Sequence, residues 1–79
     1  MDHAINSLRI YYDIALDELY EEWKSGKYLK LTDCPSFKEA NAYRSAMNVL
    51  IKACYLPEYV KDYLVAPLSK EMKFKSGEY

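Results

Sequence analysis

The first third of the chain repeats apolar residues at steps of three and four positions. Such spacing places those residues on one side of an α-helix, so the pattern predicts a helix over residues 3–25 with one side in the core. Asp2 or Asn6 can cap its start, and Gly26 is expected to end it. The apolar side comprises Ile5, Leu8, Tyr12, Ala15, Leu16, Leu19 and Trp23.

A second helix is predicted over residues 36–55. Ser36 and Glu39 have the spacing of a capping box, in which each side chain accepts a hydrogen bond from the backbone N–H of the other residue. Pro57 limits the end of this helix, because a residue that precedes proline disfavours the helical conformation. Two apolar sides are visible, so we expect the central helix of a bundle. The main side is Ala40, Tyr43, Met47, Leu50, Ile51 and Cys54, and the smaller one is Ala42, Ala46, Val49 and Ala53.

Two shorter helices are predicted after the second one. Proline suits the first turn of a helix, so a third helix is expected over residues 57–66, until Pro67 interrupts it. A fourth is expected over residues 68–74, and residues 73–79 are expected to form a mobile tail. The inward side of the third helix would be Leu56, Val60, Tyr63 and Leu64.

Between the first two helices, residues 27–31 alternate weakly between polar and apolar types, as a strand does. The rest of the chain offers no second strand pattern to pair with them. We therefore expect an extended linker that packs Leu29 and Leu31 against the core. Pairing with a strand of another chain is the alternative.

These elements together predict one all-α domain over residues 1–79, a small bundle of three helices plus a short fourth C-terminal helix. The chain has only two Gly and three Pro, which argues against a turn-rich β protein and against disorder. Asn48 and Lys52 interrupt the longest apolar stretches, so we expect no membrane span.

The two cysteines indicate a reducing compartment. Cys34 and Cys54 would lie near opposite ends of the second helix, too far apart for a disulfide. Unpaired thiols are typical of intracellular proteins, and the first residues do not show the basic and apolar regions of a signal peptide. A cytoplasmic location is therefore expected.

The net charge of −1 does not favour nucleic acid or an anionic membrane as a partner. The charges are unevenly distributed, however. Residues 1–25 carry six acids and two bases, whereas residues 26–79 carry nine bases and six acids. The simplest interpretation is that the two parts complement each other within the molecule, and the alternative is a surface directed at a partner.

Residue types suited to catalysis or metal binding are scarce. The one histidine, His3, lies near the start, so neither a rigid Cys–His pair nor a Ser-His-Asp set is expected. Cys34, expected near the surface beside a helix start, is the only plausible nucleophile, and Cys54 suits a core position. An acidic cluster on the first helix lacks the Glu-x-x-His motif of di-metal bundles. We predict no catalytic residue, metal or cofactor; the cluster is Asp13, Asp17, Glu18, Glu21 and Glu22.

Nucleic-acid binding is the alternative to a protein-interaction role. The second and third helices, with a tight break at residues 55–57, can be interpreted as a helix-turn-helix, in a small dimeric protein. Glu58 and Asp62 of the would-be recognition helix repel phosphate, and only Lys61 offsets them. Nucleic acid is therefore disfavoured as a partner.

The most informative anomaly is the pair Ile10 and Ile14, one turn apart on the side of the first helix opposite its apolar side. Three interpretations stay open: the chain's own C-terminal segment covers them, a second copy does, or a foreign protein does. An apolar pair with a charged rim is typical of a small contact surface. The rim would be Tyr11, Asp17 and Glu21, and His3 shares the same side.

Tyrosines suggest a second contact. Tyr55, Tyr59 and Tyr63 advance in steps of four, with Tyr63 expected toward the core and Tyr59 outside it. Exposed tyrosines are enriched in binding hot spots. The sequence therefore predicts a small non-catalytic protein-interaction module, such as an inhibitor, adaptor or regulator that occludes an unidentified protein partner. Compact chains of this kind are common among phage and mobile-element proteins, and a homodimer is a further expectation.

Overall fold

The computed structural model describes residues 2–77, which fold into helices without a strand. The long helices are α1 (Asp2–Lys24) and α2 (Phe37–Cys54), and the short ones are α3 (Pro57–Tyr63) and α4 (Leu68–Ser76). A single 3-10 turn, η1 (Leu31–Asp33), precedes α2. The predicted all-α bundle of three helices plus a short fourth is confirmed.

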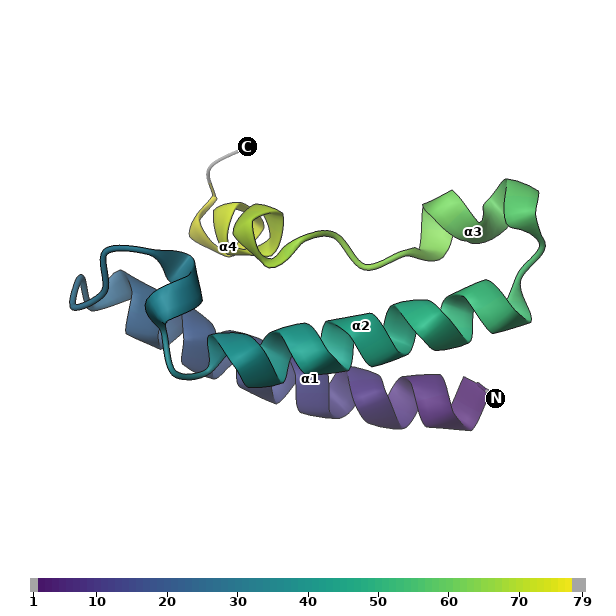
Figure 1. Ribbon diagram of the computed structural model, residues 1–79, viewed down its shortest axis with the longest axis horizontal. Helices are drawn as coiled ribbons and strands as arrows, with labels where there is room; N and C mark the ends of the chain where they lie inside the picture. Colours follow the sequence, from purple (N-terminus) through teal and green to yellow (C-terminus); the bar gives the residue numbers. More distant parts are fainter. Residues whose placement is uncertain (1, 78–79) are drawn as a thin grey trace.

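The two long helices form an antiparallel hairpin (Figure 1). The chain then reverses, and α3 and α4 follow each other along α2, with α3 near the C-terminal end of α2 and α4 near its N-terminal end (Figure 1). The core lies where α1, α2 and the segment from Val65 through α4 meet. Its buried residues are Tyr12, Ala15, Leu16, Leu19, Cys34, Ala40, Met47, Ile51, Val65, Leu68 and Met72.

The first helix ends as the sequence predicts. Gly26 adopts a left-handed φ of 76°, which residues with a Cβ rarely take, and its N–H donates to the carbonyl of Trp23. After this turn the chain does not stay extended as expected. The 3-10 turn breaks the alternation, so that Tyr28 and Leu31 pack on the core, while Leu29 is 95% exposed. The prediction that Leu29 packs inward is therefore wrong.

The predicted capping box at the start of α2 is also wrong. Ser36 has helical backbone angles (φ −79°, ψ −5°) and makes no side-chain cap bond, because an N-cap side chain reaches the first turn from an extended backbone. Its N–H and hydroxyl donate instead to the two oxygens of Glu22 in α1, at 2.8 and 2.6 Å. Glu39 accepts a hydrogen bond from the hydroxyl of Tyr43 at 3.3 Å.

Two polar side chains on α2 hold the segment that links α3 to α4. The Asn48 side chain accepts from the N–H of Val65 at 2.8 Å and donates to its carbonyl at 3.4 Å. One turn earlier, Nε of Arg44 donates to the carbonyl of Ala66 at 2.9 Å. These bonds keep the link extended, so α3 ends at Tyr63 and not at residue 66.

The second helix lies between α1 and the C-terminal segment, as predicted for a central helix, but its predicted second apolar side is not the side that this segment covers (Figure 1). Tyr43 meets α1, while Arg44 and Asn48 meet the linking segment on the neighbouring side. The opposite side stays uncovered, and Val49 is 66% exposed there. Ala42 and Ala53 of the predicted second apolar side are exposed as well.

The last helix is longer than expected. α4 continues to Ser76, where Gly77 adopts a left-handed φ of 81° and donates its N–H toward the carbonyls of Lys73 and Phe74. Residues 73–76 are therefore helical and not a mobile tail. The prediction for residues 78–79 lies outside the described part of the chain.

Candidate interaction surface

The outer side of α1 exposes the two isoleucines that the sequence singles out. Ile10 is 61% exposed and Ile14 is 54% exposed. They lie one turn apart on a helix whose other side supplies Tyr12, Leu16 and Leu19 to the core. Within residues 2–77, neither α4 nor another element covers them.

Tyr11 borders this surface on the side of α2. Its ring is exposed and stacks on Tyr43 of α2, with centroids 6.0 Å apart and an interplanar angle of 21°. The contact holds the Tyr11 ring at the junction of the two long helices, next to the isoleucines. We call Ile10, Ile14, Tyr11, Asp17 and Glu21 the α1 outer face.

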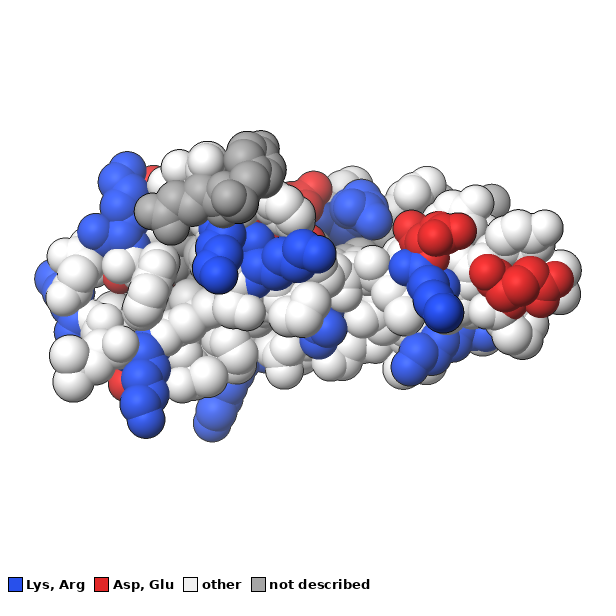
Figure 2. Space-filling view, turned by 90° about the horizontal axis from the view of Figure 1, so that it is seen from above, with Lys and Arg blue, Asp and Glu red and all other residues white. Residues whose placement is uncertain are grey.

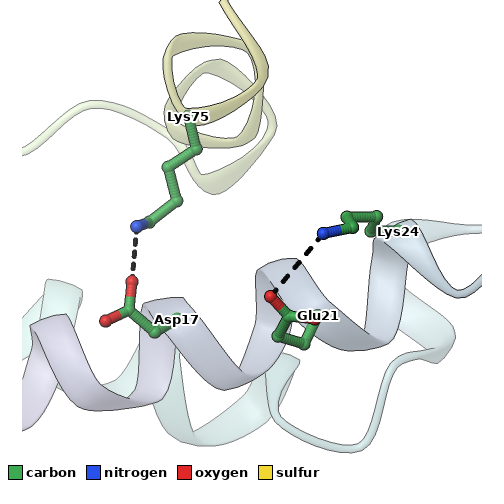
Figure 3. Close-up of polar contacts among 4 residues, drawn as sticks. All are labelled: Asp17, Glu21, Lys24 and Lys75. Atoms are coloured by element: carbon green, nitrogen blue, oxygen red, sulfur yellow. Dashed lines mark hydrogen bonds and ion pairs between the residues drawn. The ribbon is translucent and has the colours of Figure 1, made fainter.

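The two acids of the α1 outer face have different surroundings (Figure 3). Asp17 points toward α4 and forms an ion pair with Lys75, which ties the two helices together. Glu21 forms a looser pair with Lys24 of the same helix, 3.9 Å between charged atoms, and both side chains are exposed. Such exposed ion pairs contribute little to the stability of the protein, so Glu21 remains available to a partner.

The sixth predicted contact residue, Tyr59, lies on another element. Its side chain is exposed on α3, as expected. Tyr63 is exposed too, contrary to the expectation that it faces the core. The break between α2 and α3 turns Tyr55 back over it, and the two rings stack with centroids 4.2 Å apart. Five predicted contact residues thus share α1, and Tyr59 stands apart on α3.

The sequence missed other exposed apolar side chains. Leu29, Val49 and Leu56 are exposed, whereas the patterns predicted all three to be inside. Their positions repeat the period of buried residues, so periodicity alone could not reveal them. The exposure of Leu29 follows from the 3-10 turn before α2, whereas that of Val49 and Leu56 depends on where the chain after α2 packs.

The candidate nucleophile Cys34 is not near the surface. It is 3% exposed, and burial, followed by the charges of Glu22 and Asp33, raises the pKa of its thiol. The thiolate is therefore disfavoured, contrary to the expectation from its place near a helix start. Neither Cys34 nor Cys54 forms a disulfide. Among the described residues, no three His, Cys, Asp or Glu side chains are grouped to hold a metal ion.

Two cavities adjoin α4 and share Leu31 and Ser69 in their walls. One, of about 280 Å³, lies beside Trp23 and Met72. The other, of about 330 Å³, lies beside Phe37, with Lys30 and Arg44 at its wall. The side chain of Arg44 already holds the carbonyl of Ala66, so its Nε is committed to the fold.

Basic side chains gather around α4, while acids are visible toward the end that carries α3 (Figure 2). Lys75 of α4 is engaged by Asp17, and Lys70 lies 5.7 Å from the centroid of the Phe74 ring. The would-be recognition helix α3 has seven residues, with Glu58 in its first turn. No helix within residues 2–77 is long and apolar enough to cross a membrane.

Comparison of the chain with protein-family profiles, with characterised proteins and with solved structures found no significant match.

Proposed function

We propose that this protein is a small non-catalytic protein-interaction module that acts by occluding the surface of a partner protein, as an inhibitor, adaptor or regulator does. Its contact surface is the α1 outer face. The observation that carries the proposal is the exposure of Ile10 and Ile14 on a helix whose opposite side is fully used by the core.

The composition of the α1 outer face supports this role. Interfaces tend to place apolar and aromatic groups at the centre and charges at the rim. Here two β-branched side chains are adjacent, an exposed tyrosine ring borders them, and acids follow along the helix. A helix that presents such groups at steps of three and four residues can lie in the groove of another protein.

The test compares two variants in affinity capture from the lysate of the source organism. Ile10→Asp/Ile14→Asp changes the α1 outer face, and Val49→Asp makes the same kind of change on the exposed side of α2. Because all three positions are exposed, each substitution should alter the free energy of unfolding by less than about 0.5 kcal/mol. Thermal melting monitored by circular dichroism checks this.

A protein captured by the wild type and by Val49→Asp, but lost with the double variant, would support the proposal. The same protein must then change its own activity when the purified wild type is added. Equal capture by all three forms would contradict the assignment of the α1 outer face. Tyr59→Ala in the same experiment tests whether α3 makes a second contact.

A further inference from the structure

We propose that the α1 outer face also pairs with itself: two copies associate through antiparallel α1 helices, related by a two-fold axis midway between Ile10 and Ile14. This inference rests on the proposed function, since it names one occupant of the same surface. A second copy would cover the isoleucines until another protein replaces it.

The apolar residues fit a two-fold arrangement. In an isologous contact, if residue i of one copy contacts residue j of the other, then residue j of the first copy also contacts residue i of the second. When the axis passes at the level of residue 12, Ile10 of one copy lies opposite Ile14 of the other, and the reverse pair follows by symmetry. Four exposed isoleucines are then removed from water together, whereas contact with a polar surface would leave them poorly packed.

The charges along α1 select the antiparallel direction. Beyond the isoleucines, the C-terminal half of this side carries acids, and the N-terminal half carries uncharged polar residues and the positive end of the helix dipole. A parallel pair would set acids against acids. The antiparallel pair instead places Asp17, Glu18 and Glu21 of one copy opposite His3, Asn6 and Ser7 of the other.

One polar contact is central to this arrangement. Glu21 and His3 lie equally far from residue 12 and at the same angle around the helix, so each Glu21 faces His3 of the second copy. The side chain of His3 is exposed, and the Glu21 carboxylate forms the 3.9 Å pair with Lys24 and no other ion pair within residues 2–77. Asp17 keeps its ion pair with Lys75, because α4 lies beside the proposed contact.

The contact uses one side of one helix from each copy, so it buries less surface area than a standard stable interface. The dimer should therefore have a dissociation constant in the micromolar to millimolar range. Sedimentation velocity from about 10 µM to about 1 mM covers this range. The wild type and Val49→Asp should shift from monomer to dimer over it. Ile10→Asp/Ile14→Asp should stay a monomer throughout while remaining folded.

A charge exchange tests the direction. Glu21→Lys and His3→Glu should each weaken the dimer about fivefold, because each change acts twice across the axis. The combination His3→Glu/Glu21→Lys should restore the wild-type dissociation constant to within about twofold. Asp62→Lys, an equal charge change on α3, is the control and should leave the dissociation constant of the dimer unchanged.

Three results would overturn the inference: a monomeric wild type at about 1 mM, dimerisation of the double isoleucine variant, or a combined charge variant weaker than either single one. The last result would show that positions 3 and 21 of the two copies do not compensate each other, as the antiparallel pairing requires. A monomeric wild type that still captures a foreign protein would leave the proposed function standing. A dimer whose isoleucine variant captures the same proteins as wild type would instead refute that function alone.

Discussion

The carboxylate of Glu22 accepts hydrogen bonds from both the N–H and the hydroxyl of Ser36, at 2.8 and 2.6 Å, and so joins the end of α1 to the start of α2. Both residues are at least partly buried. Bonds to an ionised carboxylate are stronger than neutral ones, and removal of the acceptor leaves two donors unpaired. Glu22→Ala should therefore lower the free energy of unfolding by about 1–2 kcal/mol, measured by urea denaturation.

Neighbouring acids provide the controls for this prediction. Glu21→Ala removes only an exposed pair with Lys24 and should change the free energy of unfolding by less than about 0.5 kcal/mol. Glu39→Ala removes the residue that a capping box would need. A loss at Glu39 equal to that at Glu22 would show that Ser36 is capped from within its own helix.

The amide of Asn48 makes two hydrogen bonds to the backbone of Val65 and should be the polar side chain most important for the position of the C-terminal segment. Asn48→Ala leaves a nearly buried N–H unpaired, so we expect a loss of about 1–3 kcal/mol in the free energy of unfolding. Asn41→Ala is the matched control, because Asn41 lies on the same helix and its side chain makes no hydrogen bond within the described residues. Equal losses at both positions would refute the role of Asn48.

The sequence predicted the parts of the fold that local patterns determine. The bounds of α1 and α2 agree with the predicted ranges to within one or two residues, because long apolar periods and a terminal glycine act locally. Pro57 occupies the first turn of α3 as expected. The α1 outer face could be named in advance for the same reason: Ile10 and Ile14 break the period of their own helix.

Long-range contacts account for the errors. Ser36 and Glu39 fit a local motif, but Glu22, fourteen positions earlier, competes for Ser36 and binds it. The end of α3 is fixed by Asn48 and Arg44, which no pattern within the third helix reveals. Val49 is exposed because the chain after α2 packs on one side of it only.

Burial along α2 leads to a prediction about two neighbouring core positions. Met47 is fully buried, at 0% exposure, whereas Leu50 of the same predicted apolar side is only partly buried. Met47→Ala should cost about 2–5 kcal/mol in the free energy of unfolding, because it leaves a cavity between α1 and α2. Leu50→Ala should cost less, about 1–2 kcal/mol. Urea denaturation of both variants checks the order, and the reverse order would contradict the orientation of α2.

Substitution of the buried Tyr12 should stabilise the protein, in contrast to the substitutions of Met47 and Leu50. The Tyr12 side chain is 2% exposed, and its hydroxyl has no hydrogen-bond partner among the described residues. Burial of an unpaired hydroxyl is unfavourable, so Tyr12→Phe should raise the free energy of unfolding by about 1 kcal/mol. Tyr43→Phe is the control, because it removes a hydroxyl that is bonded to Glu39 at an exposed site. A destabilised Tyr12→Phe variant would show that the hydroxyl is hydrogen-bonded in solution.

The same hydroxyl makes stability depend on alkaline pH. Burial first, and the charge of Glu71 second, raise the pKa of Tyr12 above the ordinary tyrosine value of 10.0. Below that pH the phenol is protonated in both the folded and the unfolded chain, so it does not make the free energy of unfolding depend on pH. Above it the unfolded chain loses the proton and the folded chain keeps it, so stability falls as pH rises. Between about pH 10 and 11 the wild type should lose about 1 kcal/mol more than Tyr12→Phe does. Parallel pH profiles of the two proteins in urea denaturation would refute the burial of this phenol.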